Sequence, residues 1–150
     1  MQRVYNVNIE GQHPLPTPQE IHTELRPEME DFVETARQTI ENIIHRRDKR
    51  ILIVTGPCSI DNSDAALDYA ERLKALSKKV ESKFYLVMRT YFEKPRTTIG
   101  WKGMVYDPDL DKTFNIEKGL RSSRKLLLAM AERELPTATE FLDPIIPQYL

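Results

Sequence analysis

The sequence predicts an α/β fold in which strands of a parallel sheet alternate with helices. Short runs of β-branched and aromatic residues alternate along the chain with segments whose apolar residues recur every three or four positions. Each strand-like run is separated from the next by a segment long enough for a helical crossover. Connections of this kind build parallel sheets with right-handed crossovers.

The first 27 residues predict an extended arm rather than a helix. Apolar residues alternate loosely between Val4 and Ile9, as in a short strand. Four prolines then exclude a long helix; they are Pro14, Pro16, Pro18 and Pro27. We therefore divide the chain into an N-terminal arm, residues 1–27, and a folded domain, residues 28–150.

The pattern changes at Glu28, where apolar residues begin to recur at intervals of three and four. This spacing predicts an amphipathic helix. Its apolar positions are Met29, Phe32, Val33, Ala36, Ile40, Ile43 and Ile44. Residues 51–54 form a continuous apolar run, which is typical of a fully buried parallel strand. Gly56 and Pro57 end it.

The remaining elements continue the alternation. Asp61 or Ser63 is expected to cap a helix whose apolar face is Ala66, Tyr69, Ala70, Leu73, Leu76 and Val80. A second strand is expected at 84–90, a stretch rich in proline and aspartate at 106–111, a long helix at about 115–134 and a third strand at 137–141. The stripe of Leu126, Leu127 and Met130 on that helix is expected to be core.

Three strands with two crossover helices would leave both edges of the sheet bare and much apolar surface exposed. A (β/α)8 barrel needs eight strands and typically about 250 residues. We therefore expect this chain to be the front part of a larger enzyme, or to be completed by another component.

Composition excludes several classes of protein. Lysine and arginine total 22 and aspartate and glutamate total 23, so the net charge of −1 argues against nucleic acid as the main partner. No apolar run approaches the roughly 20 residues that span a bilayer, and the N-terminus lacks the apolar segment of a secretory signal. Cys58 is the only cysteine, so no intrachain disulfide forms, and the expected compartment is the cytoplasm.

Residues 88–103 are the most informative part of the chain. They carry four cations and one acid; these are Arg89, Lys94, Arg96, Lys102 and Glu93. A proline and two glycines keep this segment from being a helix interior. Because arginine forks and lysine heads both bind carboxylate and phosphate, the loop predicts a site for small anions. A solvated surface loop is the alternative interpretation.

Chemistry-bearing residues follow each predicted strand. Cys58 follows the first, Arg89 and the basic loop follow the second, and Glu140 lies in the third with Asp143 just beyond it. In parallel α/β folds, ligands bind beyond the carboxyl ends of the strands. The pattern therefore predicts one site that contains a thiol, cations and carboxylates, although loops are polar in any protein.

Individual residues allow more than one interpretation. Cys58 could be a small core residue or, at a strand end, a ligand for a borderline divalent metal. No catalytic partner for its thiol is evident, and the histidines are poor candidates because His13, His22 and His45 all precede the first strand. Glu140 could orient the arginines from a buried position or end a strand in solvent. Trp101 is expected to pack the loop against the body.

Several segments resemble class I 3-deoxy-D-arabino-heptulosonate 7-phosphate (DAHP) synthases, and among them the feedback-regulated microbial and fungal subtype. These segments are Gly-Pro-Cys-Ser-Ile at 56–60, the run at 88–103 with Lys-Pro-Arg-Thr-Thr at 94–98, Thr-Ala-Thr-Glu-Phe-Leu-Asp at 137–143, and Pro-Gln at 147–148. The resemblance covers about residues 28–150 with matching spacing, and the long string at 94–98 is highly specific.

The resemblance implies that the chain is about three βα units of a (β/α)8 barrel. The family condenses phosphoenolpyruvate with erythrose 4-phosphate and water to give DAHP and phosphate. This transferase reaction is the first step of the shikimate pathway and of aromatic amino acid biosynthesis. A divalent metal of the Mn, Fe, Co or Zn type is implied, acting as a Lewis acid at the aldehyde.

Roles for individual residues follow from the same resemblance. By motif position, Cys58 would be a metal ligand, Arg89 would bind the phosphoenolpyruvate anion, and Lys94 would polarise or protonate the aldehyde oxygen between the two substrates. Arg96 and Thr97 would hold the phosphate of erythrose 4-phosphate, and the other substrate-binding residues would be Pro95 and, behind the first layer of the pocket, Glu140. A loop that borders a site for an inhibitory aromatic amino acid would contain Asp143, Pro144, Pro147 and Gln148.

The family's other metal ligands, a His, a Glu and an Asp, lie on later strands, so we expect this chain to be inactive alone. The family's front arm supports dimer and tetramer contacts, which implies a homo-oligomer. Two hypotheses from other classes remain open at this stage. The chain could be a non-catalytic remnant that binds a partner subunit, or a small anion-binding module without chemistry.

Overall fold

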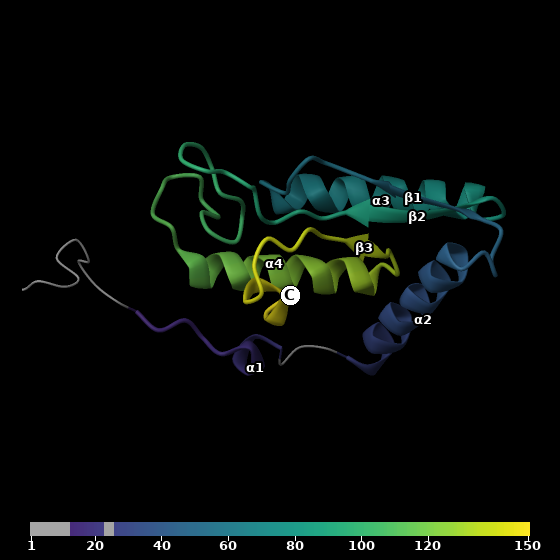
Figure 1. Ribbon diagram of the computed structural model, residues 1–150, viewed down its shortest axis with the longest axis horizontal. Helices are drawn as coiled ribbons and strands as arrows, with labels where there is room; N and C mark the ends of the chain where they lie inside the picture. The colour runs from purple at the N-terminus through teal and green to yellow at the C-terminus, as the bar shows by residue number, and fades with distance from the viewer. Residues whose placement is uncertain (1–12, 23–25) are drawn as a thin grey trace, which may run out of the picture.

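A computed structural model describes residues 13–22 and 26–150, where three parallel strands form one sheet (Figure 1). The strands are β1 (Ile51–Thr55), β2 (Phe84–Arg89) and β3 (Thr137–Ala138), and they lie side by side in the order β1-β2-β3. Ile51 pairs with Phe84, and Met88 pairs with Thr137. The predicted α/β fold with a parallel sheet is therefore confirmed.

Helices connect the strands in the predicted alternation. They are α1 (Pro18–Ile21), α2 (Pro27–Ile44), α3 (Ser63–Val80), α4 (Ile116–Glu132) and a short 3₁₀ helix, η1 (Ile146–Gln148). The first of them is a single turn within the predicted arm, closed by a capping box between Thr17 and Glu20. The strand predicted between Val4 and Ile9 lies outside the described residues.

Helix starts differ from prediction by small amounts that capping chemistry explains. Helix α2 includes Pro27, because a proline fits the first turn, where its missing N–H has no partner to lose. The cap of α3 is Asn62, whose side chain accepts a hydrogen bond from the Ala65 amide at 2.9 Å, so the prediction of Asp61 or Ser63 was wrong.

Strand β1 is not fully buried, contrary to the prediction from its apolar run. The side chains of Ile51 and Val54 are 59% and 49% exposed. The reason is topological, since within the described residues β1 pairs with β2 alone and forms an edge of the sheet.

Strand β3 is shorter than predicted and ends at Ala138. Its last ladder hydrogen bond runs from the Thr90 amide to the Ala138 carbonyl at 2.8 Å, after which the chain following β2 turns away. Glu140 therefore lies beyond the strand, and the prediction that placed it within the strand was wrong.

The core lies between the sheet and two helices. Ala70 of α3, Met88 of β2 and Leu120 of α4 are fully buried in one apolar cluster. Helix α3 contacts both β2 and α4. Leu126 and Met130 are buried and Leu127 packs against the cluster, as the apolar stripe predicted. Figure 1 shows α2 at one end of the molecule and the long loop after β2, coloured teal to green, at the other.

A membrane span would require a longer and more apolar helix than any in the part of the chain that the structure describes.

Candidate active site

The ends of β1 and β2 touch at the edge of the sheet that leads into the long loop. Gly56, just after β1, lies so close to Arg89 that a Cβ atom on Gly56 would be 2.9 Å from the Arg89 carbonyl oxygen. Only a residue without a side chain permits this approach. The turn after β1 is therefore held against the last residue of β2.

Two hydrogen bonds fix the turn that carries Cys58. The Ser59 hydroxyl and the Ile60 amide both donate to the Tyr91 carbonyl, at 3.1 and 2.8 Å. Since Ile60 is also buried in the core, the turn has one defined position. The thiol of Cys58 is left exposed at its surface, which excludes the interpretation of this residue as core filling.

Two cations converge on Cys58. The Lys94 Nζ atom lies 2.8 Å from the Cys58 Sγ atom, and the Arg89 Nη2 atom donates to the Cys58 carbonyl at 3.1 Å. The hydrogen bond from Lys94 and its positive charge lower the pKa of the Cys58 thiol, and the charges of Arg89 and Arg96 add to the effect. The arrangement therefore favours the thiolate, which is the form that binds metals and acts as a nucleophile.

Arg89 is held by a second contact that leaves part of its guanidinium unsatisfied. Its Cζ atom lies 3.9 Å from the centroid of the Tyr91 ring, within the range of a cation–π contact. Its buried Nε–H has no hydrogen-bond partner. A planar cation with an unmet donor at a strand end is suited to bind a carboxylate or phosphate.

The basic loop closes on itself at its base. The Lys94 amide donates to the Lys102 carbonyl at 2.9 Å, and the Val105 amide donates to the Phe92 carbonyl at 3.2 Å. Gly103 makes the closure possible, because its φ is +108° and a Cβ atom there would lie 2.2 Å from the Phe92 carbonyl oxygen. The Lys102 ammonium donates across the loop to the Arg96 carbonyl at 2.7 Å.

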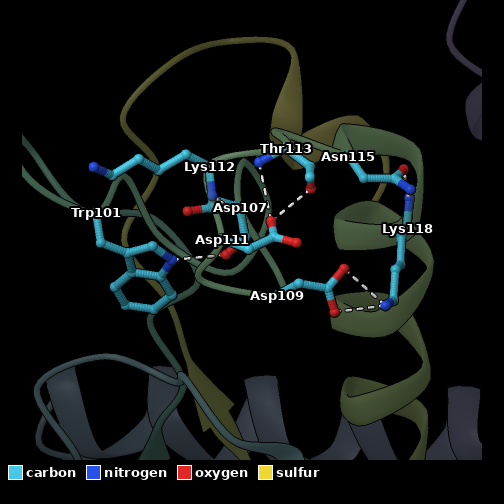
Figure 2. Close-up of polar contacts among 8 residues, drawn as sticks. All are labelled: Trp101, Asp107, Asp109, Asp111, Lys112, Thr113, Asn115 and Lys118. Carbon is cyan, nitrogen blue, oxygen red and sulfur yellow. Dashed lines mark hydrogen bonds and ion pairs between the residues drawn. The ribbon is translucent and has the colours of Figure 1, made fainter.

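Trp101 anchors the loop to the acidic turn that follows it (Figure 2). Its indole N–H donates to the Asp107 carbonyl at 2.7 Å, and its ring packs against the core cluster. This turn comprises residues 107–113. The Asp109 carboxylate ties it to α4 by pairing with Lys118 at 2.6 Å, and within the turn Asp111 accepts hydrogen bonds from both the amide and the hydroxyl of Thr113. The predicted packing role of Trp101 is thus confirmed.

An open hollow of about 650 Å³ lies beside the basic loop. It is lined by Glu93, Lys94, Pro95, Arg96, Thr97, Lys102, Tyr106, Phe114, Leu142 and Asp143. Lys94, Pro95, Arg96 and Thr97 were predicted to bind substrate, and Asp143 was predicted to belong to an effector loop. Cys58, Arg89 and Glu140 are not among its lining residues. Lys94 thus joins two groups of predicted residues, since it contacts Cys58 and also lines the hollow, whereas Glu140, Pro144, Pro147 and Gln148 lie in neither group.

Sequence reasoning gave no site role to four residues that line this hollow, Glu93, Tyr106, Phe114 and Leu142, of which Glu93 and Tyr106 contact each other. Glu93 is only 2% exposed, and the Tyr106 hydroxyl lies 3.0 Å from both the Glu93 Oε1 atom and the Asp143 Oδ2 atom. The available signal was a single acid within a run of four cations. Its spacing from Tyr106 and Asp143 gave no hint of contact, because loops that meet in space leave no periodicity in sequence.

The predicted effector loop forms a compact turn at the other side of the hollow. The Asp143 Oδ1 atom accepts hydrogen bonds from the amides of Ile145 and Ile146, at 2.6 and 2.9 Å, and so holds the turn that leads into η1. The Gln148 side chain donates to the Pro144 carbonyl at 3.0 Å. These bonds order the segment.

Cys58 does not form a metal centre with other described residues. Catalytic zinc sites use three protein ligands, and within residues 13–22 and 26–150 no group of three or more His, Cys, Asp or Glu residues is arranged to hold a metal ion. An exposed thiol with a lowered pKa nevertheless suits a borderline divalent ion as one donor. The described residues therefore fit one ligand and not a complete site.

The chain is similar in sequence to known phospho-2-dehydro-3-deoxyheptonate aldolases. Over 147 residues the chain is 49% identical to the Tyr-sensitive phospho-2-dehydro-3-deoxyheptonate aldolase of Escherichia coli (strain K12), covering 97% of this chain and 41% of that protein. It is 43% identical to the phospho-2-dehydro-3-deoxyheptonate aldolase of Corynebacterium glutamicum, with 96% and 40% of the two chains covered. The chain thus spans about 41% of the length of the E. coli relative.

A solved structure shares the fold. The phospho-2-dehydro-3-deoxyheptonate aldolase of Francisella tularensis SCHU S4 superposes with a TM-score of 0.90 at 47% identity, over 95% of this chain and 42% of that chain. The model of the DAHP synthetase I family matches residues 22–150, which contain the basic loop, the Cys58 turn and all three strands. The chain therefore belongs to the DAHP synthetase I family.

Proposed function

We propose that this chain supplies the first strands and the anion-binding residues of a (β/α)8 barrel enzyme that makes DAHP from phosphoenolpyruvate and erythrose 4-phosphate. The observation that carries the proposal is the convergence of Arg89, Lys94 and Cys58 at the carboxyl ends of β1 and β2. In (β/α)8 enzymes the active site lies at this edge. The names of the E. coli and C. glutamicum relatives support the same reaction.

Strand order supports the barrel. The strands follow one another across the sheet in chain order, and α3 and α4 contact each other. A barrel is built by repeating such a unit in one direction, whereas a doubly wound sheet reverses its strand order. We propose that residues 28–150 are the front part of the barrel domain and that residues 1–27 are an arm.

Arg89 and Lys94 carry the central steps of the proposed reaction. The planar fork of Arg89 matches the carboxylate or phosphate of phosphoenolpyruvate. Lys94 lies between Cys58 and the hollow, where its ammonium can donate to the aldehyde oxygen as negative charge develops there. Both substrates are anions, so these cations also offset the repulsion between them.

The second substrate is assigned to the hollow. Pro95, Arg96 and Thr97 line it, and the Arg96 guanidinium and the Thr97 hydroxyl are suited to hold the phosphate of erythrose 4-phosphate. By its place in the motif at 137–143 we assign Glu140 to the pocket, behind the residues that contact substrate; it is half-buried beyond β3 and does not line this hollow.

The family generally uses a divalent metal, and we propose Cys58 as one of its ligands, with the others supplied from outside the described residues. An ion of the Mn, Fe, Co or Zn type would act there as a Lewis acid. Because Lys94 hydrogen-bonds to the Cys58 sulfur, an ion bound there would share that atom with the ammonium, and metal binding by Cys58 would then influence the proton on Lys94.

Regulation is proposed from the names of relatives. The E. coli relative is Tyr-sensitive, and a relative from Buchnera aphidicola that is 48% identical is named Trp-sensitive. We propose that an aromatic amino acid binds beside the turn formed by Asp143, Pro144, Pro147 and Gln148, and that the enzyme is a homo-oligomer. The ordered turn at 143–148 offers a defined surface for such a ligand.

A chimera tests the proposed function. This chain replaces the matching segment of the E. coli relative, and DAHP formation is measured with metal and both substrates. We expect the chimera to be active, the 150-residue chain alone to be inactive, and Arg89→Ala or Lys94→Ala to lower activity by about 10- to 100-fold, the value of one charged hydrogen bond. Lys118→Ala is the control, because Lys118 pairs with Asp109 away from the site.

A folded, metal-loaded chimera without activity would refute the synthase proposal. If the chain alone binds phosphoenolpyruvate in an NMR titration while the folded chimera makes no product, the anion-binding module becomes the better description.

A further inference from the structure

Three groups meet beneath the basic loop in a way that restricts where protons can lie. The Tyr106 hydroxyl is 3.0 Å from Glu93 Oε1 and 3.0 Å from Asp143 Oδ2. A phenol has one proton to donate. It can therefore satisfy only one carboxylate, and the other contact is a hydrogen bond only if that carboxyl group carries a proton of its own.

The surroundings of the two carboxyl groups decide which of them holds the extra proton. Asp143 Oδ1 already accepts hydrogen bonds from the amides of Ile145 and Ile146, which favour the charged form. Glu93 is 2% exposed and forms no ion pair with any described residue. Its Oε2 atom has no hydrogen bond of good geometry, although the Leu142 amide is close enough to favour the charged form. Of the two carboxyl groups, that of Glu93 is thus the one that holds the extra proton.

The charged groups around Glu93 do not reverse this assignment. The hollow contains the cations Lys94, Arg96 and Lys102, besides Asp143 and Tyr106. The Lys94 ammonium donates to Cys58 and the Lys102 ammonium donates to the Arg96 carbonyl, so two of these heads are directed away from Glu93.

We propose that Glu93, Tyr106 and Asp143 form a proton-sharing clasp, in which Glu93 donates to Tyr106 and Tyr106 donates to Asp143. Glu93 precedes Lys94 at the root of the basic loop, and Asp143 accepts a hydrogen bond from the first amide of η1. The clasp joins the substrate side of the hollow to the 141–148 segment, and loss of the Glu93 proton opens it. This inference concerns a protonation state of the fold and does not depend on the proposed function.

The pKa directions of all three groups agree with this geometry. Burial and the neighbouring Asp143 raise the pKa of Glu93. A hydrogen bond donated by Tyr106, whose direction the clasp reverses, and the Leu142 amide act in the opposite direction. Burial opposes ionisation of Asp143, yet the Ile146 and Ile145 amides, Tyr106 and Glu93 together lower its pKa. Burial and both carboxyl neighbours raise the pKa of Tyr106, so the phenol keeps its proton.

The first experiment measures the Glu93 pKa by carbon-13 NMR of side-chain carboxyl groups in the purified chain. We expect a value above the ordinary 4.5. Asp143→Asn should lower it, because the amide donates to Tyr106, which then donates to Glu93. Tyr106→Phe should also lower it, because protonated Glu93 loses the oxygen that accepts its hydrogen bond. Asp109→Asn, an acid outside the clasp, should leave it unchanged. An ordinary Glu93 pKa in the wild type, or a Glu93 pKa that either clasp variant leaves unchanged or raises, would overturn the proposal.

A second variant keeps the proposal testable if either of these substitutions unfolds the chain. Glu93→Gln mimics the protonated acid and is expected to fold. Because the folded-state pKa of Glu93 is raised, the wild type should gain stability as pH falls through that pKa toward 4.5. Glu93→Gln should lack this gain in urea unfolding. Parallel stability curves for the two proteins between pH 4.5 and 8 would contradict the clasp.

Discussion

The Lys94 Nζ atom lies 2.8 Å from the Cys58 Sγ atom, although the two residues are 36 positions apart in the chain. This contact joins the turn after β1 to the loop after β2. It also couples the two kinds of chemistry assigned to the site, since one residue is a candidate metal ligand and the other a candidate proton donor. A substitution at either position should therefore change the properties of the other.

Replacing Lys94 should change the reactivity of Cys58. The hydrogen bond and charge of Lys94 lower the thiol pKa, so Lys94→Met should raise it and reduce the thiolate fraction at neutral pH. The measurement is the pH dependence of the rate of alkylation by iodoacetamide, whose midpoint should move to higher pH. Lys102→Met removes a nearby cation that contacts the Arg96 carbonyl instead, and should move the midpoint less. Equal midpoints in the wild type and Lys94→Met would contradict the contact.

Replacing Arg89 by lysine should weaken substrate binding, although the substitution keeps the positive charge. Lysine lacks the planar fork that matches a carboxylate or phosphate and stacks differently on an aromatic ring, and Arg89 lies 3.9 Å from the Tyr91 ring centroid. In the chimera, Arg89→Lys should raise the KM for phosphoenolpyruvate by about 10-fold, the lower range for one charged hydrogen bond. Tyr91→Leu should have a smaller effect. Unchanged KM in Arg89→Lys would remove Arg89 from the substrate site.

Two glycines of the basic loop provide a matched test of close packing. Gly103 and Gly100 have nearly equal φ angles, +108° and +107°, so alanine is strained at both by about 1–3 kcal/mol. Only at Gly103 would the new Cβ atom also meet backbone, at 2.2 Å from the Phe92 carbonyl oxygen. Gly103→Ala should therefore lower the free energy of unfolding clearly more than Gly100→Ala in urea titrations. Equal losses of unfolding free energy in the two variants would mean that the backbone around Gly103 can shift to accommodate the added Cβ atom.

Gly119 should show the opposite of ordinary helix behaviour. Alanine in place of glycine within a helix is normally stabilising by about 0.5–1 kcal/mol. At Gly119 of α4, however, a Cβ atom would lie 2.0 Å from the Val105 carbonyl oxygen. We expect Gly119→Ala to destabilise the chain and to lower its melting temperature, while Lys125→Ala on the exposed side of α4 should have little effect. A stabilised Gly119→Ala variant would show that the 104–105 segment does not pack on α4.

The sequence was sufficient for the order and type of the main elements. Apolar spacing located α2, α3 and α4 to within a few residues, and the β-branched run located β1. It did not give the exposure of Ile51 and Val54, because an apolar run predicts burial only if both sides of the strand are covered. Nor did it give the early end of β3, which depends on where β2 stops pairing.

The sequence by itself determined the family, the alternation of strands and helices, and the cations of the basic loop, since these depend on local pattern and a specific motif. Only the tertiary structure decided that Lys94 donates a hydrogen bond to Cys58 and that Glu93, Tyr106 and Asp143 meet beneath the loop. The physical reason is that these contacts join residues far apart in the chain, through turns whose paths are set by packing and by close approaches such as those at Gly56 and Gly103. Such contacts leave no periodic trace in the sequence.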